Sequence, residues 1–267
     1  MNLIKYIILS IISGTLNPLP LSLNSHFSFY NNLFNTKIFE NPNNFLIINN
    51  IALTLTLLII FFNPLKKIFI NSLKFFLTKD KEKKKKYHIS FKYLLLLTLS
   101  SIPLSIITII TNNKSFSLPN KLNAITLIIN FILILIINKK EGTIKEKDLS
   151  LKLVLPISLF SLLSLIPGTS YITLILTICT LLKFNKQLTL EFTFMSLIFT
   201  NIHKILISLN TLTLTDILIP ATLALCISSL ITYLTYKWFI KIYNQKKLWF
   251  IALYSFITAI FILIWFR

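Results

Sequence analysis

Residues 150–183 read SLKLVLPISLFSLLSLIPGTSYITLILTICTLLK, and this stretch decides the fold. It is apolar on both sides of a break at the sequence PGTS, residues 167–170. Each apolar half is shorter than the roughly 20 residues that a straight helix needs to cross a membrane. Broken backbone at membrane depth is tolerated where it is buried in protein. The stretch therefore predicts a re-entrant helical hairpin.

The composition of the whole chain also indicates a membrane protein. Of 267 residues, 55% are hydrophobic and 13% are charged, which is about half the charge of a soluble globular protein. A soluble enzyme, a disordered tail and a secreted disulfide scaffold are therefore excluded. Cys179 and Cys226 lie inside apolar segments, so neither a disulfide framework nor a metal cluster is predicted. Six apolar runs are long enough to span the bilayer, namely residues 45–63, 91–111, 122–138, 190–209, 215–236 and 248–266.

A second interrupted apolar region lies near the N-terminus, at residues 3–30. It is broken at SG, residues 13–14, and at NPLP, residues 17–20. A signal peptide is the alternative interpretation, but two prolines stand where its cleavage site would be expected. Two of the three glycines of the chain, Gly14 and Gly168, fall at the breaks. A positive φ or a close approach of two backbones is the natural reason for glycine there.

The two interrupted regions are predicted to enter the membrane from opposite faces, and each is followed by three spanning runs. This layout predicts an inverted-topology repeat, in which broken helices meet near the midplane of the membrane and build the site. The expected fold is an all-α polytopic membrane protein with six transmembrane helices and two re-entrant helical hairpins. We expect a single membrane domain with pseudo-repeat halves at residues 1–140 and 146–267.

The distribution of charge predicts the orientation. The net charge of +19 comes from 27 basic and 8 acidic residues. Lysines gather in connections between apolar runs, above all in the basic loop 64–90 with its run from Lys83 to Lys86. Because positive charge marks the cytoplasmic side, this loop is assigned to the cytoplasm and both termini to the outer side. Anionic lipid accounts for the lysine run, and no nucleic-acid partner is expected.

Both hairpins carry residues that could perform chemistry. The half-helix that follows residues 167–170 offers N–H groups to an anion at its N-terminus. Thr169 and Ser170 are suited to cap that helix, and plain capping is the alternative interpretation. His26 follows the first break and could act as a nucleophile or as a general acid or base. A merely solvated histidine is the alternative at that position.

Two further candidates, His203 and Lys204, lie near the predicted outer end of the run 190–209. Snorkelling of the lysine to the membrane surface is the simple explanation, and an outward cavity that uses its charge is the other. Neither break carries a carboxylate. No set of protein ligands for a metal ion is therefore visible in the sequence.

Three motifs of the chain resemble those of one family. Residues 13–26, SGTLNPLPLSLNSH, are similar to its first signature, E-G-x-T-E-F-L-P-V-S-S-x-G-H. Residues 165–170, LIPGTS, are similar to the start of its second, L-I-P-G-T-S-R-S-G, and residues 191–194, EFTF, to its E-F-S-F. In their order and spacing over the whole chain, these motifs resemble the bacterial undecaprenyl-diphosphate phosphatases of the BacA/UppP type.

The resemblance implies a hydrolase that works on a membrane lipid. Its substrate would be a polyprenyl diphosphate, which it converts to the monophosphate carrier and inorganic phosphate for peptidoglycan and cell-wall synthesis. Such enzymes confer bacitracin resistance. The active site would face the outer side of the bacterial inner (cytoplasmic) membrane. A divalent cation, Mg²⁺ or Ca²⁺, would aid the hydrolysis. A homodimer is left open.

Part of the family's site carries over to this chain. The resemblance implies that Ser22 and His26 are catalytic residues. It also implies that Gly168, Thr169 and Ser170 form the phosphate-binding segment.

Several charged and polar residues of the family's site are replaced in this chain. Losing one contact to the transition state commonly costs about 2.7–4 kcal/mol, so other groups would have to compensate, with His203 and Lys204 as candidates. The replaced positions are Ser13 and Asn17, which stand for two glutamates thought to hold the metal, Leu23, which stands for a serine, and Tyr171, which stands for a phosphate-binding arginine.

The sequence leaves three hypotheses open. The first is a phosphatase for polyprenyl diphosphate that retains catalysis despite the replaced motif residues. The second is a catalytically impaired homologue that binds or transports polyprenyl phosphate on the same fold. The third is a decaying relic of such an enzyme.

Overall fold

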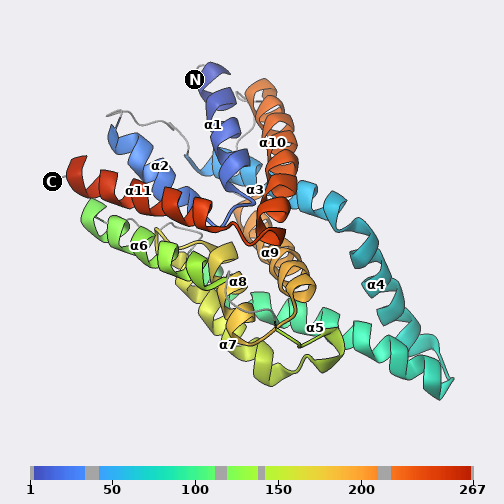
Figure 1. Ribbon diagram of the computed structural model, residues 1–267. Coiled ribbons are helices and arrows are strands. Elements are labelled where there is room, and N and C mark those ends of the chain that lie inside the picture. The colour runs from blue at the N-terminus through green and yellow to red at the C-terminus, as the bar shows by residue number, and fades with distance from the viewer. Residues whose placement is uncertain (1–2, 34–41, 112–118, 138–141, 210–217, 266–267) are drawn as a thin grey trace.

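The computed structural model describes residues 3–33, 42–111, 119–137, 142–209 and 218–265, and in these ranges the chain is helical (Figure 1). The described part contains no β-strand apart from an isolated bridge between Ile144 and Phe184. The all-α class is therefore confirmed. The helices are α1 Leu3–Leu16, α2 Leu23–Leu33, α3 Pro42–Ile60, α4 Phe62–Leu77, α5 Lys81–Ile110, α6 Asn120–Ile137, η1 Glu146–Asp148, α7 Leu151–Ser161, η2 Leu162–Leu165, α8 Tyr171–Leu181, α9 Lys186–Ser208, α10 Leu218–Asn244 and α11 Trp249–Trp265.

By length and composition, four described helices can each cross a membrane: α5, α6, α9 and α10. A fifth span results if α3 and α4, which are bent by 75° at Phe61, are taken together as one broken span. The sixth predicted span corresponds to α11, a shorter apolar helix of 17 residues. The protein is thus polytopic, and its helices lie where the apolar runs predicted them.

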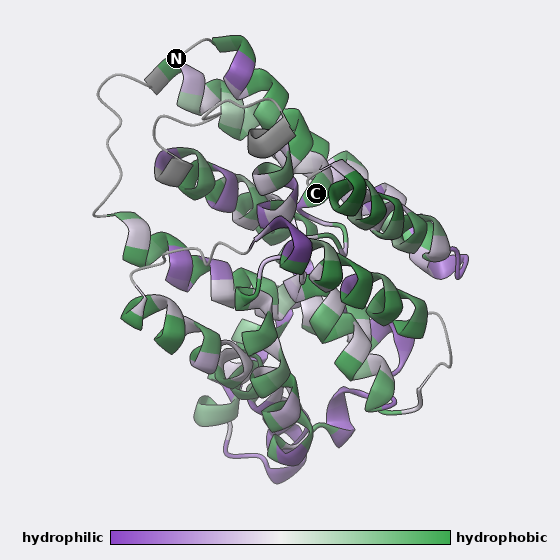
Figure 2. Ribbon diagram, turned by 90° about the vertical axis from the view of Figure 1, so that its left-hand side faces the viewer, coloured by the Kyte–Doolittle hydropathy of each residue, from purple (hydrophilic) through white to green (hydrophobic). Residues whose placement is uncertain are grey.

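The outer surface and the interior have the polarity of a protein that sits in lipid. Large apolar side chains on the spanning helices face outward, with Ile59 73% and Ile110 75% exposed. Polar side chains are buried instead, among them Asn130 and Thr193, both at 0%. Figure 2 shows largely hydrophobic helices, with hydrophilic residues mainly at their ends and in the connections. Because buried polar groups must find partners inside the protein, this interior is where a site can form.

Both interrupted regions fold as two helices joined by a break. In the second region, α7 continues through η2 and α8 begins at Tyr171, after the PGTS sequence. In the first region, the prediction of a break at residues 13–14 is wrong, because α1 runs through them to Leu16. Gly14 instead serves packing: a Cβ there would lie 2.9 Å from Ile231 Cβ and from the Ser228 carbonyl oxygen of α10. Small residues allow this close approach of two helices.

The basic segment 64–90 is helical rather than an irregular loop. It forms α4 and the first turns of α5, and the Asp80 side chain caps α5 by accepting from the Glu82 N–H at 3.0 Å. The two helices pack together through Phe75 and Phe91, whose ring centroids lie 5.0 Å apart. Figure 1 shows this helical pair extending away from the rest of the molecule. Its assignment to the cytoplasmic side stays a prediction.

The helices pack in a symmetrical order. Neighbouring pairs are α1 with α10, α10 with α3, α3 with α9, α9 with α5, and α5 with α7. The set of neighbouring pairs is unchanged when α1 is exchanged with α7, α3 with α9, and α5 with α10. This pattern agrees with an inverted repeat, although the division into halves at residues 1–140 and 146–267 stays a prediction.

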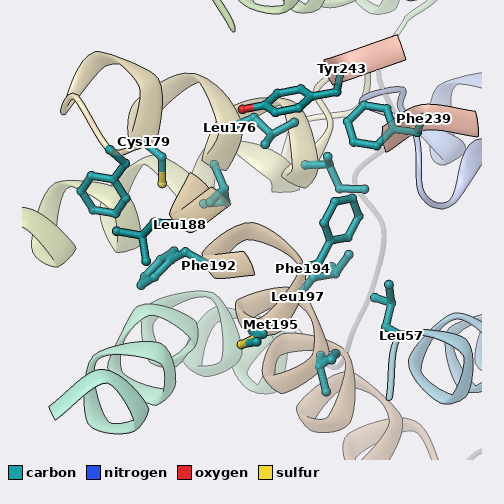
Figure 3. Close-up of a cluster of buried hydrophobic side chains, with 14 of the residues drawn as sticks. Leu57, Leu176, Cys179, Leu188, Phe192, Phe194, Met195, Leu197, Phe239 and Tyr243 are labelled. Carbon is teal, nitrogen blue, oxygen red and sulfur yellow. The ribbon is translucent and has the colours of Figure 1, made fainter. Parts of the chain in front are cut away.

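The helix α9 lies at the centre of this order and carries much of the core. Figure 3 shows its buried side chains, including Phe192 and Phe194, pointing into the surrounding helices. The Phe194 ring contacts Tyr236 and Phe239 of α10, with centroids 5.0 and 5.9 Å away. Aromatic packing of this kind fixes α9, and α8 packs directly against it.

Candidate functional site

The two breaks meet inside the protein, as the layout of the sequence predicts. The Gly168 N–H donates to the Ser22 hydroxyl oxygen at 3.2 Å. The Thr173 hydroxyl donates to the carbonyl oxygen of Pro20 at 2.8 Å. All four residues come from the two hairpins, and Ser22 and Thr173 are buried. The candidate site is therefore the contact between the breaks.

Local sequence explains why the backbone is broken at these points. Gly168 has a φ of +98°, which residues with a side chain rarely adopt. A Cβ on Gly168 would also lie only 1.7 Å from the Thr126 hydroxyl oxygen of α6. In the other break, Pro18 and Pro20 have no N–H to continue a helix. The carbonyl oxygen of Pro20, which lies between α1 and α2, accepts the hydrogen bond from the Thr173 hydroxyl of α8.

Asn130 of α6 joins the two breaks, and the sequence analysis missed it. Its side-chain N–H donates to the Pro20 carbonyl oxygen at 3.0 Å. Its side-chain oxygen accepts from the Ser170 N–H at 3.3 Å. An amide in the middle of the apolar run 122–138 was the signal that could have revealed it, because a polar group at membrane depth needs a partner.

His26 is buried beside the first break, at 1% exposure. Its Nδ1 lies 2.6 Å from the Ser22 carbonyl oxygen. Since a carbonyl oxygen can only accept, Nδ1 carries the proton in the neutral ring and Nε2 carries the lone pair. Nε2 is buried and has no hydrogen-bond partner among the residues that the structure describes, and the ring stacks on Tyr254 of α11 at 5.6 Å. The alternative of a merely solvated histidine is wrong, and the ring offers a buried basic nitrogen.

Ser22 has two donors on its hydroxyl oxygen. One is the Gly168 N–H, and the other is the Ser25 hydroxyl at 3.1 Å. If a substrate oxygen takes the position of the Ser22 hydroxyl oxygen, the same two donors stabilise negative charge on it. His26 contacts the Ser22 carbonyl group rather than its hydroxyl, so the two predicted catalytic residues are adjacent without being directly coupled.

The expected side-chain capping of α8 is wrong. Ser170 stands at the N-cap, but its side chain makes no capping hydrogen bond. The Thr169 hydroxyl donates back to the carbonyl oxygens of Leu163 and Ile166, at 2.6 and 2.7 Å. The side chains therefore brace the break itself. The N-terminus of α8, with its positive end of the helix dipole, is left facing the contact between the breaks.

The positions of the two expected metal-binding glutamates hold a neutral network. Asn17 and Asn49 donate to each other's side-chain oxygens at 2.9 and 3.1 Å, and the Ser228 hydroxyl donates to Asn49 at 2.9 Å. The Ser13 hydroxyl donates to the Ser10 carbonyl oxygen at 3.2 Å. Within the described ranges, no group of three His, Cys, Asp or Glu side chains could hold a metal ion. Mg²⁺ and Ca²⁺ prefer carboxylate oxygens, so these residues do not fit the divalent cation.

Tyr171, at the position of the expected arginine, points to α9. Its hydroxyl donates to Ser196 at 3.1 Å and accepts from Thr200 at 3.4 Å. It therefore adds no cation to the break. Leu23, at the position of the expected serine, packs partly buried against the hydrophobic core.

His203 and Lys204 are half-buried near the end of α9. The Nδ1 of His203 lies 2.9 Å from the Ser105 hydroxyl of α5. In the part of the chain that the structure describes, no hydrogen bond or ring contact joins either residue to His26. Their compensating role stays a prediction.

Comparisons with known proteins agree with the motifs. The family model described as bacitracin resistance protein BacA matches residues 6–261. The chain is 26% identical to undecaprenyl-diphosphatase 1 of Bacillus cereus, covering 98% of this chain and 97% of the relative. It is 24% identical to undecaprenyl-diphosphatase of Oceanobacillus iheyensis, covering 98% of this chain and 96% of the relative.

Proposed function

Because the chain belongs to the bacitracin resistance protein BacA family, we propose that it is a membrane phosphatase for undecaprenyl diphosphate. The products are undecaprenyl monophosphate, the lipid carrier of cell-wall synthesis, and inorganic phosphate. The observation that carries the proposal is the basic nitrogen of His26, which is buried where the two hairpin breaks meet and has no partner within the described ranges of the chain. The names of the relatives support the same substrate.

The groups at the break divide the work of hydrolysis. The Gly168 N–H and the N-terminus of α8 hold oxygens of the terminal phosphate. A phosphate oxygen that accepts a hydrogen bond from the Gly168 N–H lies beside the Ser22 hydroxyl. That hydroxyl can donate its own proton to the phosphate oxygen.

His26 supplies the base. Its Nε2 takes a proton from water, and the resulting hydroxide attacks the terminal phosphorus. The bond from that phosphorus to the bridging oxygen breaks, and the electron pair leaves with undecaprenyl monophosphate. The proton on His26 then returns to solvent or to a phosphate product. None of these steps uses a metal ion, in keeping with the neutral pair of Asn17 and Asn49.

The family and the distribution of charge support a proposal for the location. The protein is a membrane protein of a bacterial family. We place it in the cytoplasmic membrane with the lysine-rich α4 and the first turns of α5 on the cytoplasmic side, because positive charge favours that side. The hairpin break that carries His26 then opens to the outer side, where the lipid diphosphate is released during cell-wall synthesis.

Phosphate release from undecaprenyl diphosphate by the purified protein in nanodiscs tests the proposal. Undecaprenyl monophosphate is the control substrate and should yield no phosphate. We expect release from the diphosphate that persists in the presence of EDTA. Binding of the lipid without any release would contradict a phosphatase and would favour a lipid binder or transporter.

A further inference from the structure

Asn130 is buried in a way that demands an explanation. It lies in α6, a helix with an otherwise apolar middle, and has 0% exposure. Burying an amide without hydrogen bonds is strongly unfavourable. Asn130 avoids this cost because it donates to Pro20 and accepts from Ser170. Hydrogen bonds to the backbone of Pro20 and Ser170, which belong to different hairpins, thus offset the cost of burying the Asn130 amide.

The two bonds of Asn130 run in opposite directions and need two kinds of atom. The Pro20 carbonyl oxygen requires a donor, and the Ser170 N–H requires an acceptor. A planar amide presents both at a fixed separation. Leucine has a similar size but offers neither, and an ionised aspartate offers only acceptors. The site therefore specifies the chemistry of an amide.

The direct contacts between the breaks leave a role for Asn130. The bond from Gly168 to Ser22 lies on the path of the phosphate in the proposed function and must open when the lipid binds. The bonds of Asn130 lie behind it, on the backbone of Pro20 and Ser170, and need not open. The Thr173 hydroxyl shares the Pro20 carbonyl oxygen from within α8.

We propose that Asn130 is a positioning residue that holds the two hairpin breaks in register, so that the N-terminus of α8 faces Ser22 and His26. This inference rests on the proposed function for its catalytic consequence. The bridge itself is independent of any activity. Without it, the Ser170 N–H is buried without a partner and the break at residues 167–170 loosens from the one at 17–22.

Hydrogen–deuterium exchange measured on the protein in nanodiscs tests the bridge directly. In Asn130→Leu, we expect increased deuterium uptake in peptides that cover residues 19–26 and 166–173. The matched control is Asn123→Leu, because Asn123 is also a buried asparagine of α6 but its side-chain oxygen has no partner in the described part of the chain. Unchanged uptake at both breaks in a folded Asn130→Leu protein would overturn the proposal.

Asn130→Asp keeps the test valid if the leucine variant does not fold. A protonated carboxyl group can donate to Pro20 and accept from Ser170, whereas an ionised one cannot donate. We expect natural protection of both breaks at about pH 5, where the carboxyl group can be protonated, and loss of it at about pH 9, where it is ionised. Comparison with the natural protein at each pH cancels the effects of other titratable side chains near α6. These are Tyr171 and Cys179 of α8, Tyr254 of α11, and His26 and Tyr30 of α2, whose Phe29 packs against α6.

Phosphate release separates this inference from the proposed function. We expect Asn130→Leu to lower kcat about 100-fold, as misplacement by about 1 Å can do, with a smaller effect on KM. Asn130→Asp should show this loss at high pH only. If the natural protein releases no phosphate, the proposed function fails, and the exchange experiment alone decides the bridge. If release occurs and Asn130→Leu retains full kcat, the positioning role is contradicted.

Discussion

The backbone N–H of Gly168 donates to the hydroxyl of Ser22 at 3.2 Å, across a separation of 146 residues. This hydrogen bond joins the two broken hairpins at the place where the motifs of the family lie. The backbone geometry of Gly168 is therefore as important to the site as any side chain, and it gives the first prediction.

Gly168→Ala is expected to destabilise the protein. A side chain at a positive φ costs about 1–2 kcal/mol, and the new methyl group would overlap the Thr126 side chain. Thermal unfolding in detergent measures the effect. The double variant Gly168→Ala/Thr126→Ala should recover part of the loss, because it removes the hydroxyl oxygen 1.7 Å from the new methyl group, whereas the Cβ at 2.5 Å and the positive φ remain. Equal stability of Gly168→Ala and the natural protein would contradict the strained geometry.

The amide pair of Asn17 and Asn49 is expected to behave as one unit. Asn17→Leu leaves the buried amide of Asn49 with fewer partners, at a cost of about 1–3 kcal/mol. The double variant with leucine at both positions should lose less stability than the sum of the two single variants. Chemical denaturation of all four proteins checks this non-additivity, and strictly additive losses would show that the pair is not coupled.

The natural protein is expected to be indifferent to divalent cations. Its groups at the family's metal positions are neutral and already hydrogen-bonded. Mg²⁺, Ca²⁺ and EDTA should therefore leave its unfolding temperature unchanged. The double variant Ser13→Glu/Asn17→Glu introduces two carboxylates and should gain a cation-dependent rise in that temperature. A rise of the same size in the natural protein would reveal a cation site that these residues do not explain.

Tyr171→Arg is expected to strengthen binding of the diphosphate. A guanidinium group supplies the bidentate, charged hydrogen bonds that a tyrosine cannot, so KM should fall by about tenfold, as roughly 1.4 kcal/mol implies. The control Tyr171→Phe loses its bonds to Ser196 and Thr200 but no charge. We expect it to leave KM unchanged. A fall in KM in both variants would point to packing rather than charge.

The stability of the segment before α7 is expected to depend on pH through Glu146. Burial raises the pKa of this carboxyl group, repulsion by Glu191 raises it further, and Lys67 opposes both effects. The folded state therefore binds the proton more tightly than the unfolded state. Glu146 then favours folding only at low pH, and stability is lost as the pH rises through the raised pKa.

Glu146→Gln removes this dependence. The variant should unfold at a higher temperature than the natural protein near neutral pH, and the difference should vanish in acid. Glu82→Gln, which alters an exposed glutamate in the first turn of α5, is the control and should show no such trend. A variant that is less stable than the natural protein at neutral pH would contradict the assigned cause.

The sequence predicted the helical fold well because apolar runs and their interruptions are local signals. The PGTS break and the span that became α9 follow from composition alone. The break expected at Gly14 was wrong, since a glycine that permits close packing against α10 and one that permits a turn look the same in a sequence.

The site was harder to predict because it is made by contacts between distant segments. His26 was found from its motif, but the state of its two nitrogens depends on the carbonyl group of Ser22. Asn130 has no motif, and only the folded structure shows that its amide meets both breaks. The pairing of Asn17 with Asn49 likewise could not be foreseen from either residue.

The variant His26→Asn tests the central claim most directly. Asparagine can still donate to the Ser22 carbonyl oxygen as Nδ1 does, but it has no counterpart of the unpartnered Nε2. His88→Asn, at an exposed position of α5, is the matched control. Phosphate release from undecaprenyl diphosphate should fall by about 10²–10⁴-fold in His26→Asn and stay unchanged in His88→Asn. Undiminished release by a folded His26→Asn protein would show that the buried nitrogen of His26 is not the base.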